Sequence, residues 1–275
     1  MRGALVQLTS GRTVASNLEV LEAHIRAAVA EGAEFVFTPE TSLMMETRRA
    51  DVLEKARYEA EDEALAALQA LALEAGVWLS LGSIMVKVAD DRLANRSFLI
   101  GPDGAIKARY DKIHLFDVDL GEGQVYRESA LYEAGREAVV ADTPFGLVGM
   151  SVCYDLRFPY LYRALAGAGA RILLVPAAFT RPTGEAHWHA LLRARAIENG
   201  AFVIAAAQTG DHETGRATYG HSLVIAPWGE VVVDAGTAPG VTLFDIDLAK
   251  VDAARQKVPS LDHTRTFSVT RTETP

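Results

Sequence analysis

Short apolar runs with the composition of β-strands alternate with longer segments of helical periodicity along most of this chain. The runs at residues 4–8, 35–37 and 78–84 are separated by segments whose apolar positions recur at helical spacing. Other apolar runs follow one another across turn signals such as Gly101-Pro102-Asp103-Gly104. Because hairpins and strand–helix–strand units occur in one chain, the pattern predicts an α/β fold with mixed sheets covered by helices.

The expected elements follow from these patterns and from the residues that bound them. Ser16 stands three residues before Glu19, a capping-box spacing, and is predicted to begin a helix that Gly32 ends in a left-handed conformation. Helices are expected at residues 16–31, 61–75, 160–168 and 186–199. Strands are expected at 4–8, 35–37, 78–84, 97–100, 147–152, 172–175, 202–207, 223–225, 231–234 and 241–246.

The domain organisation is predicted to be simple. The sequence contains no repeat or low-complexity linker, so residues 1–275 are expected to form a single domain. The tail from about residue 257 is polar and rich in Thr and Arg, and we expect it to lie over the surface or over a neighbouring subunit.

Charge and composition argue against several classes of partner. There are 27 Lys and Arg against 36 Asp and Glu, a formal charge of −9, whereas nucleic-acid binding needs clustered basic residues. The chain has no apolar stretch of the roughly 18 residues that a membrane helix requires, and its first residues lack a signal-peptide pattern. One cysteine excludes an intramolecular disulfide. We therefore expect a cytoplasmic protein without a nucleic-acid or membrane partner.

The single cysteine, Cys153, follows the apolar run 147–152 and precedes a helical segment. A nucleophile at such a strand-to-helix turn is held rigidly, and neighbouring backbone N–H groups can face a developing oxyanion. A small buried apolar side chain is an equally good interpretation of this segment taken alone.

A cysteine nucleophile reacts as the thiolate, so it needs a base or a positive neighbour. Glu40 and Lys112 each follow a strand-like run, where a sheet commonly gathers its functional groups. The carboxylate can take the thiol proton and return it to a leaving amine, and the ammonium can stabilise an oxyanion. Either residue taken alone is more commonly part of a surface ion pair.

The histidines offer alternatives to this set. His187 or His221 would serve as the base of a Cys–His hydrolase. His187 and His189 do not share one face of a helix, and there is no second cysteine, so no metal site is predicted.

Three segments together resemble the carbon–nitrogen hydrolase (nitrilase-like) superfamily, whose members use a Glu-Lys-Cys triad. The segments occur in the family's order, and the likeness extends from about Leu5 to Thr266. They are Phe37-Thr38-Pro39-Glu40, Tyr110-Asp111-Lys112-Ile113-His114-Leu115-Phe116-Asp117 and Cys153-Tyr154-Asp155-Leu156-Arg157-Phe158-Pro159. The resemblance implies a four-layer α-β-β-α sandwich, a homodimer or higher homo-oligomer, no cofactor, and Glu40, Lys112 and Cys153 as catalytic residues.

The same resemblance assigns further site residues. Glu128, within Arg127-Glu128-Ser129, matches a second glutamate that is hydrogen-bonded to the lysine, and the Tyr154 N–H is expected to bind the oxyanion. Arg157 is expected either to bind a substrate carboxylate or to pair with Asp155. Phe179 and Thr183 are expected to line the same pocket.

Segments after the cysteine point to one branch of the superfamily. Ala205-Ala206-Ala207-Gln208, Tyr219-Gly220-His221-Ser222 and Pro227-Trp228-Gly229 are similar to the branch that contains deaminated glutathione amidases. The resemblance implies hydrolysis of a small carboxylate-bearing amide to an acid and ammonia through a thioester, with deaminated glutathione as the expected substrate. Omega-amidases acting on 2-oxoglutaramate or 2-oxosuccinamate share the triad and remain the alternative. A non-catalytic binding protein on the same fold is the second alternative.

Overall fold

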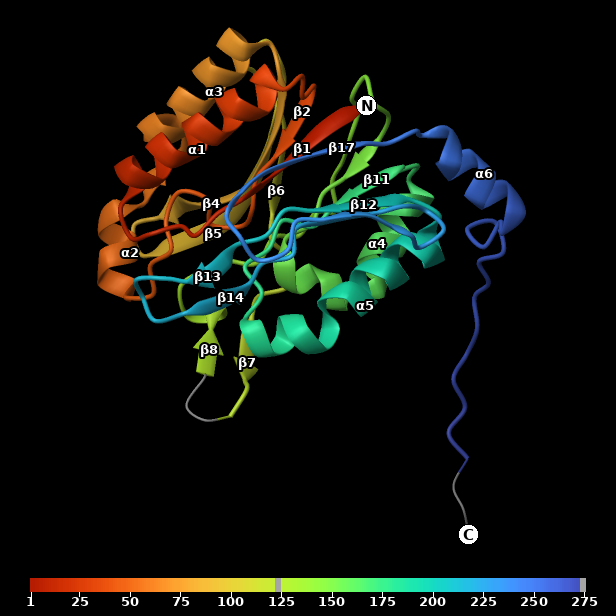
Figure 1. Ribbon diagram of the computed structural model, residues 1–275. Coiled ribbons are helices and arrows are strands. Elements are labelled where there is room, and N and C mark those ends of the chain that lie inside the picture. The colour runs from red at the N-terminus through yellow and green to blue at the C-terminus, as the bar shows by residue number, and fades with distance from the viewer. Residues whose placement is uncertain (122–124, 273–275) are drawn as a thin grey trace.

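Two β-sheets, each covered by helices on its outer face, make up the body of the molecule (Figure 1). The computed structural model describes residues 1–121 and 125–272. The first sheet has the strand order β17-β1-β2-β4-β5-β6, with β3 beside β4, and the second has the order β16-β15-β12-β11-β10-β9. The strands of the first sheet are β1 (Arg2–Gln7), β2 (Phe35–Phe37), β3 (Arg57–Tyr58), β4 (Trp78–Ala89), β5 (Arg92–Ile100), β6 (Ile106–Asp111) and β17 (Gly240–Asp245). Those of the second are β9 (Val140–Ala141), β10 (Val148–Gly149), β11 (Ile172–Leu174), β12 (Phe202–Ala205), β15 (Leu223–Ile225) and β16 (Val231–Asp234).

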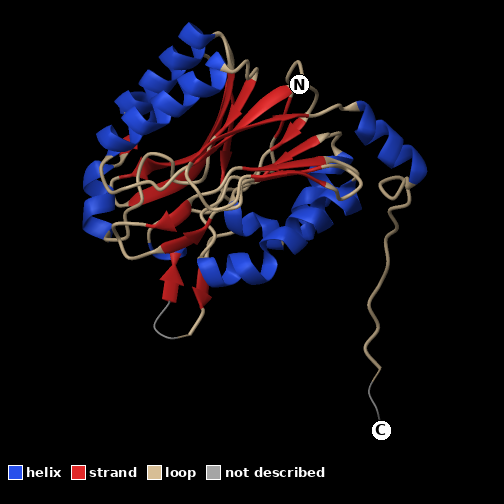
Figure 2. Ribbon diagram, viewed as in Figure 1, coloured by secondary structure: helices blue, strands red, loops and turns tan. Residues whose placement is uncertain are grey.

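Helices complete the four layers, as Figure 2 shows. The first sheet is covered by α1 (Val14–Ala30) and α3 (Glu63–Ala75), and the second by α4 (Pro159–Gly167) and α5 (Arg181–Asn199). The remaining helices are α2 (Arg49–Lys55) and α6 (Ala249–Lys257), and two small hairpins are formed by β7 (Asp117–Asp119) with β8 (Val125–Arg127) and by β13 (Thr209–Asp211) with β14 (Ala217–Tyr219). The α-β-β-α sandwich expected from the sequence is confirmed.

Parallel strands at the centre of each sheet determine where functional side chains can gather. In the first sheet β1, β2 and β4 are parallel, and in the second β10, β11 and β12 are parallel. The carboxyl ends of parallel neighbours lie at one edge, so the loops after them meet there. The loops after β2, β10 and β11 carry Glu40, Cys153 and Ala178 respectively.

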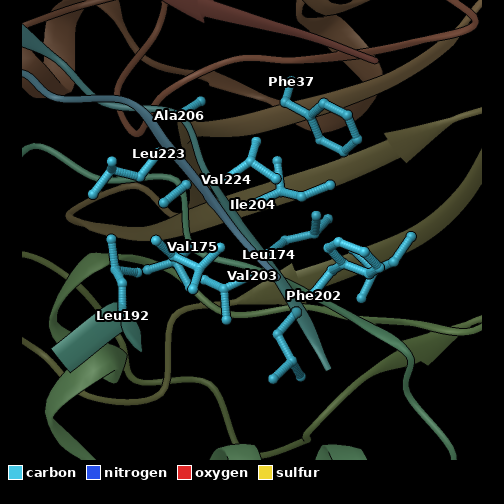
Figure 3. Packing of buried hydrophobic residues seen from close by; sticks show 14 of the residues in the cluster. Phe37, Leu174, Val175, Leu192, Phe202, Val203, Ile204, Ala206, Leu223 and Val224 are labelled. Carbon is cyan, nitrogen blue, oxygen red and sulfur yellow. The ribbon is translucent and has the colours of Figure 1, made fainter. Parts of the chain in front are cut away.

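The second sheet is buried on both faces, which explains the continuous apolar run at its strand β12. Phe202 and Ile204 point toward Phe37 of the first sheet, whereas Val203 points toward Leu192 of α5 (Figure 3). All five side chains are at most 2% exposed. Each such side chain contributes about 1.5–3 kcal/mol when it is fully buried. The packing of the two sheets therefore rests on alternate residues of strands that are apolar throughout.

Some local expectations are corrected by the structure. Helix α1 begins at Val14, so Ser16 lies inside the first turn and the prediction that it begins the helix is wrong. The start is fixed instead by the buried Asn17, whose amide exchanges hydrogen bonds with the backbone N–H and carbonyl of Gly11 at 2.8 and 2.9 Å. Gly32 follows the helix with φ +90°, so the left-handed ending is confirmed.

The strand expected at 147–152 contains only the two residues of β10, because the chain turns toward Cys153 directly afterwards. Helices α2 and α6 and the two small hairpins were not expected from the sequence. Within the described part of the chain, no helix is both long and apolar enough to cross a bilayer.

The C-terminal tail leaves the body of the molecule after α6 ends at Lys257 (Figure 1). Arg163 holds its first part, donating to the hydroxyl of Thr264 at 3.0 Å and contacting Ser260. Farther along, Phe267 and Val269 are each 86% exposed. The packing of this tail on a neighbouring subunit and the single-domain organisation stay predictions, and residues 273–275 lie outside the described residues.

A substitution at Gly82 of β4 tests how closely this strand packs against the loop that carries Glu40. A methyl group there would lie 2.0 Å from the Thr38 carbonyl oxygen and 2.4 Å from that of Pro39. Because both neighbours are backbone atoms, we expect Gly82→Ala to lower the free energy of unfolding by about 1–3 kcal/mol. Thermal unfolding measures the effect.

Gly167→Ala in α4 is the matched control, because an added methyl group meets no atom within 4 Å there. We expect it to leave stability unchanged or slightly raised. Equal melting temperatures for Gly82→Ala and the wild type would contradict the close approach.

Candidate active site

A pocket of about 390 Å³ opens where the central strands of the two sheets end. Its size is typical of sites that enclose small molecules. It is lined by all eight of the site residues expected from the sequence, together with others. The eight are Glu40, Lys112, Glu128, Cys153, Tyr154, Arg157, Phe179 and Thr183.

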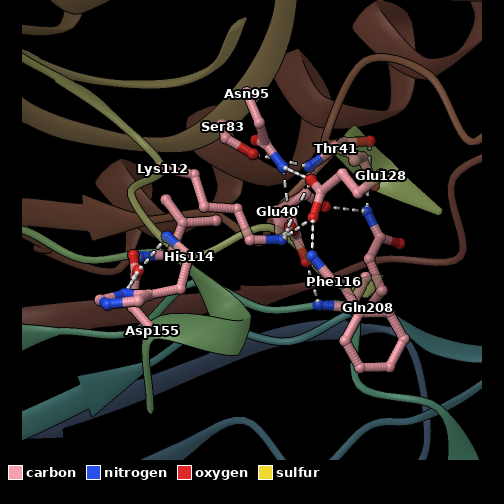
Figure 4. Close-up of polar contacts among 12 residues, drawn as sticks. Glu40, Thr41, Ser83, Asn95, Lys112, His114, Phe116, Glu128, Asp155 and Gln208 are labelled. Atoms are coloured by element: carbon pink, nitrogen blue, oxygen red, sulfur yellow. Dashed lines mark hydrogen bonds and ion pairs between the residues drawn. The ribbon is translucent and has the colours of Figure 1, made fainter. Parts of the chain in front are cut away.

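Glu40 is fixed by hydrogen bonds to both of its carboxylate oxygens. It follows β2 across Pro39 and is only 3% exposed. Its Oε1 accepts from Lys112 Nζ at 3.0 Å and from Asn95 Nδ2 at 2.9 Å (Figure 4). Its Oε2 accepts from the backbone N–H of Ala178 at 2.9 Å. Segments from both sheets therefore orient this carboxylate.

Lys112 lies between two carboxylates. It follows β6, is 2% exposed, and donates from Nζ to Glu40 and to both oxygens of Glu128, at 2.9 and 3.1 Å. Glu128 also accepts from the backbone N–H of Phe116 at 2.6 Å and from Asn95 Nδ2 at 3.1 Å. We call Glu40, Lys112 and Glu128 the ion cluster. With two acids and one ammonium, its net charge is −1.

Contacts within the ion cluster determine the protonation states of Lys112 and Glu40. Burial alone would lower the pKa of Lys112, but the charges of Glu128 and Glu40 outweigh it and raise that pKa well above its usual value. Burial alone would raise the pKa of Glu40, but the Lys112 ammonium, with smaller contributions from Cys153 and Arg216, holds it below its usual value. At neutral pH the lysine is a cation and Glu40 is a carboxylate.

Cys153 occupies a turn that presents its thiol to the ion cluster. It begins the short 3-10 helix η3 (Cys153–Arg157), has φ +51°, and donates its backbone N–H to the Pro176 carbonyl at 2.9 Å. Such a left-handed conformation is strained for a residue with a side chain. Burial and the charge of Glu40 raise the pKa of the thiol well above its usual value, although Lys112 lowers it in part. The resting side chain is therefore a neutral thiol beside a carboxylate, so its activation requires a base.

Asp155 joins the nucleophile turn to the lysine segment. This fully buried carboxylate accepts from the Tyr110 hydroxyl at 2.7 Å, from the Val152 N–H at 2.8 Å and from the His114 N–H at 3.0 Å. The hypothesis that Arg157 pairs with Asp155 is therefore wrong. Arg157 contacts Nδ1 of His187 at 3.3 Å, and its guanidinium lies 5.4 Å from the centroid of Phe179.

Two residues of this site were missed in the sequence. Asn95 of β5 bridges Glu40 and Glu128, and Arg216, between β13 and β14, lines the pocket and donates to the Ala178 carbonyl. Neither belongs to a segment with a recognisable motif. Only the pairing of strands distant in the sequence brings them to the pocket.

The histidines lie elsewhere. Among the described residues that line the pocket there is no histidine, so the Cys–His alternative has no base at Cys153. His189, His221 and Asp234 place potential ligand atoms within 4.8 Å of one another. Asp234 is hydrogen-bonded to both imidazoles, at 3.1 Å to His189 and 2.9 Å to His221, which accounts for the arrangement without an ion. The absence of a metal site stays a prediction.

The sequence is also similar to known proteins. A Yersinia enterocolitica protein named deaminated glutathione amidase is 41% identical over 269 residues, covering 96% of this chain and 93% of that protein. A Dictyostelium discoideum protein of the same name is 47% identical over 198 residues, 70% of this chain and 68% of the relative.

Solved structures agree with the fold. The crystal structure of the Caenorhabditis elegans NitFhit protein has a TM-score of 0.90 at 38% identity, covering 96% of this chain and 65% of that one, so this chain spans about two thirds of its length. Saccharomyces cerevisiae Nit3, described as a member of branch 10 of the nitrilase superfamily, has a TM-score of 0.85 at 28% identity and 94% coverage of both chains. The profile of the family described as carbon–nitrogen hydrolase matches residues 2–256. On these grounds the chain belongs to the carbon–nitrogen hydrolase family.

Proposed function

We propose that this chain is a cysteine-dependent amidase that hydrolyses deaminated glutathione. The observation that carries the proposal is the buried ion cluster beside a thiol at the base of one pocket. A carboxylate, an ammonium and a sulfur nucleophile together can transfer a proton, stabilise an oxyanion and form a covalent intermediate.

In the first half of the reaction, Glu40 takes the thiol proton while Sγ of Cys153 bonds to the amide carbon. The carbonyl oxygen becomes an oxyanion, which the Lys112 ammonium and the backbone N–H of Tyr154 stabilise. Tyr154 is the second residue of η3, so its N–H has no carbonyl acceptor within that turn. The protonated Glu40 then gives its proton to the leaving nitrogen, the carbon–nitrogen bond breaks, and a thioester remains.

In the second half, Glu40 removes a proton from water, which attacks the thioester carbon. The carbon–sulfur bond breaks and the acid product leaves, while Cys153 regains its proton. Glu128 assists by holding Lys112, at 2.9 Å, in place for both oxyanions. One water is consumed, and one acid and one amine are released.

The choice of substrate is supported by the relatives, since proteins named deaminated glutathione amidase are 41% identical over almost the whole chain. Deaminated glutathione carries its amide between a 2-oxo acid and a cysteinylglycine dipeptide. The leaving amine is therefore the dipeptide, so the expectation that ammonia is released does not hold for this substrate. Ammonia leaves only from unsubstituted amides such as 2-oxoglutaramate. Both ends of this substrate are carboxylates, and Arg157 provides one cation for them.

We further propose that the enzyme acts in the cytoplasm as a homodimer or a higher homo-oligomer. A reducing compartment keeps the free thiol of Cys153 available. Ile197 and Trp228, each 53% exposed, offer apolar surface to a second copy.

Replacing the nucleophile tests the chemistry. We expect Cys153→Ala to lower kcat by about 10⁴-fold or more, because no covalent intermediate can form. Steady-state kinetics measure the loss, and thermal unfolding shows whether the variant is folded. A folded variant with activity near that of the wild type would disprove the assignment and favour a binding role.

Replacing Lys112 tests the electrostatics. Lys112 lowers the pKa of Glu40, so Lys112→Met should raise that pKa. On acidification, the Glu40 carboxylate of the variant is then protonated at a higher pH than that of the wild type. In the wild type the acid limb of the kcat/KM profile lies below 4.5, the ordinary pKa of a glutamate. In Lys112→Met this limb moves to higher pH, and kcat/KM falls about 10²–10³-fold.

Lys107→Met, which removes an exposed lysine paired with Asp103, is the control and should leave both quantities unchanged. An acid limb that stays in place in Lys112→Met would contradict the coupling between Lys112 and Glu40.

A direct comparison of substrates tests the proposed specificity. We expect kcat/KM for deaminated glutathione to exceed that for 2-oxoglutaramate by about 10-fold or more, because the larger substrate makes additional contacts in the pocket. Both substrates release 2-oxoglutarate, so the rate of its formation measures both reactions. The reverse preference would identify an omega-amidase.

A further inference from the structure

Arg157 and Arg216 line the pocket, and neither has an acidic partner among the described residues. Arg157 contacts His187 and the rings of Tyr154 and Phe179. Arg216 donates to the carbonyl of Ala178 and lies 5.6 Å from the centroid of Tyr126. In residues 1–121 and 125–272, neither guanidinium forms an ion pair with a carboxylate of the protein.

Other charged groups at the pocket are compensated or turned away. Glu46 pairs with Arg12 at 2.8 Å and with Lys55 at 3.0 Å, and Lys112 has its two glutamates. Arg127 is exposed and donates to backbone carbonyls of its own hairpin. Arg49, which also lines the pocket, lies 4.0 Å from a carboxylate oxygen of Asp91 and donates to two backbone carbonyls. Among the described residues, the uncompensated positive charge beside the ion cluster therefore comes from Arg157 and Arg216.

Arg216 also has an unused donor. Its Nε is buried and has no hydrogen-bond partner in the described structure. Leaving a buried donor unpaired costs about 1–3 kcal/mol, more for a charged group. A carboxylate is the ligand that satisfies a guanidinium best, because it accepts two parallel hydrogen bonds.

The position of Arg216 relative to Glu40 indicates which part of a substrate it meets. Ala178 donates its N–H to Oε2 of Glu40, and its carbonyl accepts from the guanidinium of Arg216. The single residue Ala178 therefore connects Glu40 and Arg216. The positive charge of Arg216 is also among the causes that lower the pKa of Glu40. Glu40 protonates the leaving nitrogen in the proposed mechanism. The leaving group must therefore lie on the side of the pocket where Arg216 is found.

We propose that Arg216 binds the terminal carboxylate of the leaving peptide, whereas Arg157 serves the 2-oxo acid end of the substrate. This inference rests on the proposed amidase function and makes the site selective for amides with a carboxylate on each side of the scissile bond. Two residues span at most about 7 Å, so the carboxylate of a leaving dipeptide stays within reach of a side chain near Glu40. An unsubstituted amide releases ammonia and offers nothing to Arg216.

The decisive measurement compares deaminated glutathione with its analogue in which the terminal carboxylate is a carboxamide. With the wild type we expect KM to rise about 10- to 100-fold for the carboxamide, the loss typical of a charged hydrogen bond. Equal KM values would overturn the proposal without any variant, so the test does not depend on a substitution folding.

The same pair of substrates is then given to Arg216→Met. This variant should treat the acid and the carboxamide alike, and its KM for deaminated glutathione should match the wild-type value for the carboxamide. Because Arg216 also lowers the pKa of Glu40, the variant's absolute rates can change for every substrate. The readout is therefore the ratio of the KM values for the acid and the carboxamide, which should fall close to one. Arg216→Lys should keep part of the preference, because it retains the charge but lacks the planar fork.

Arg181→Met is the matched control. Arg181 of α5 is exposed, does not line the pocket, and pairs at 3.0 Å with Asp211 of β13, the strand that precedes Arg216. It should leave all of these constants unchanged. If Arg216→Met lowers kcat for every substrate and keeps the preference for the acid, Arg216 only positions Glu40 and the proposal is wrong. A wild type that hydrolyses 2-oxoglutaramate but not deaminated glutathione would instead refute the proposed substrate.

Discussion

The ion pair between Lys112 and Glu40, completed by Glu128, is the interaction on which the active end of this molecule depends. Removing charges from water costs several kcal/mol per ion, and the cost is offset only where each group has several well-placed partners. Here the ammonium donates to three carboxylate oxygens, and Asn95 donates to both acids. No member of the ion cluster is therefore stable until four segments are correctly placed: the end of β2, the centre of β5, the end of β6 and the turn after β8.

The thiol belongs to the other half of the molecule, so the packing of the two sheets determines the distance between base and nucleophile. Glu40 and Lys112 follow strands of the first sheet, whereas Cys153 and Ala178 follow strands of the second. Phe37, three residues before Glu40, is buried in the same apolar cluster as Cys153. Asp155 adds a polar connection across this boundary through Tyr110 and His114. The apolar core and the catalytic geometry are thus determined by the same contact between sheets.

Local sequence patterns predicted the parts of this arrangement that depend on single strands. The apolar run 35–37 followed by Pro39 located the strand end at Glu40, and the run before Cys153 located the nucleophile turn. Glu128 came from a family resemblance alone, because an acid in a loop has no distinguishing pattern. Asn95 and Arg216 were missed, since their partners are 55 and 38 residues away. Ser16 failed as a helix start for a similar reason, because Asn17 at that end of α1 also donates to the Leu43 carbonyl, 26 residues away.

Moving the proton within the pair of Glu40 and Cys153 leaves the net charge of the buried site unchanged. The thiol is neutral at rest because burial and Glu40 raise its pKa, and its proton passes to a carboxylate that loses one charge as the sulfur gains one. Lys112 then serves as counter-ion to Glu40, to the thiolate and to the oxyanion in turn. A preorganised cation that faces each successive anion needs little rearrangement during the reaction. This explains why a lysine that lies between two acids, and never gives up its proton, is central to the chemistry.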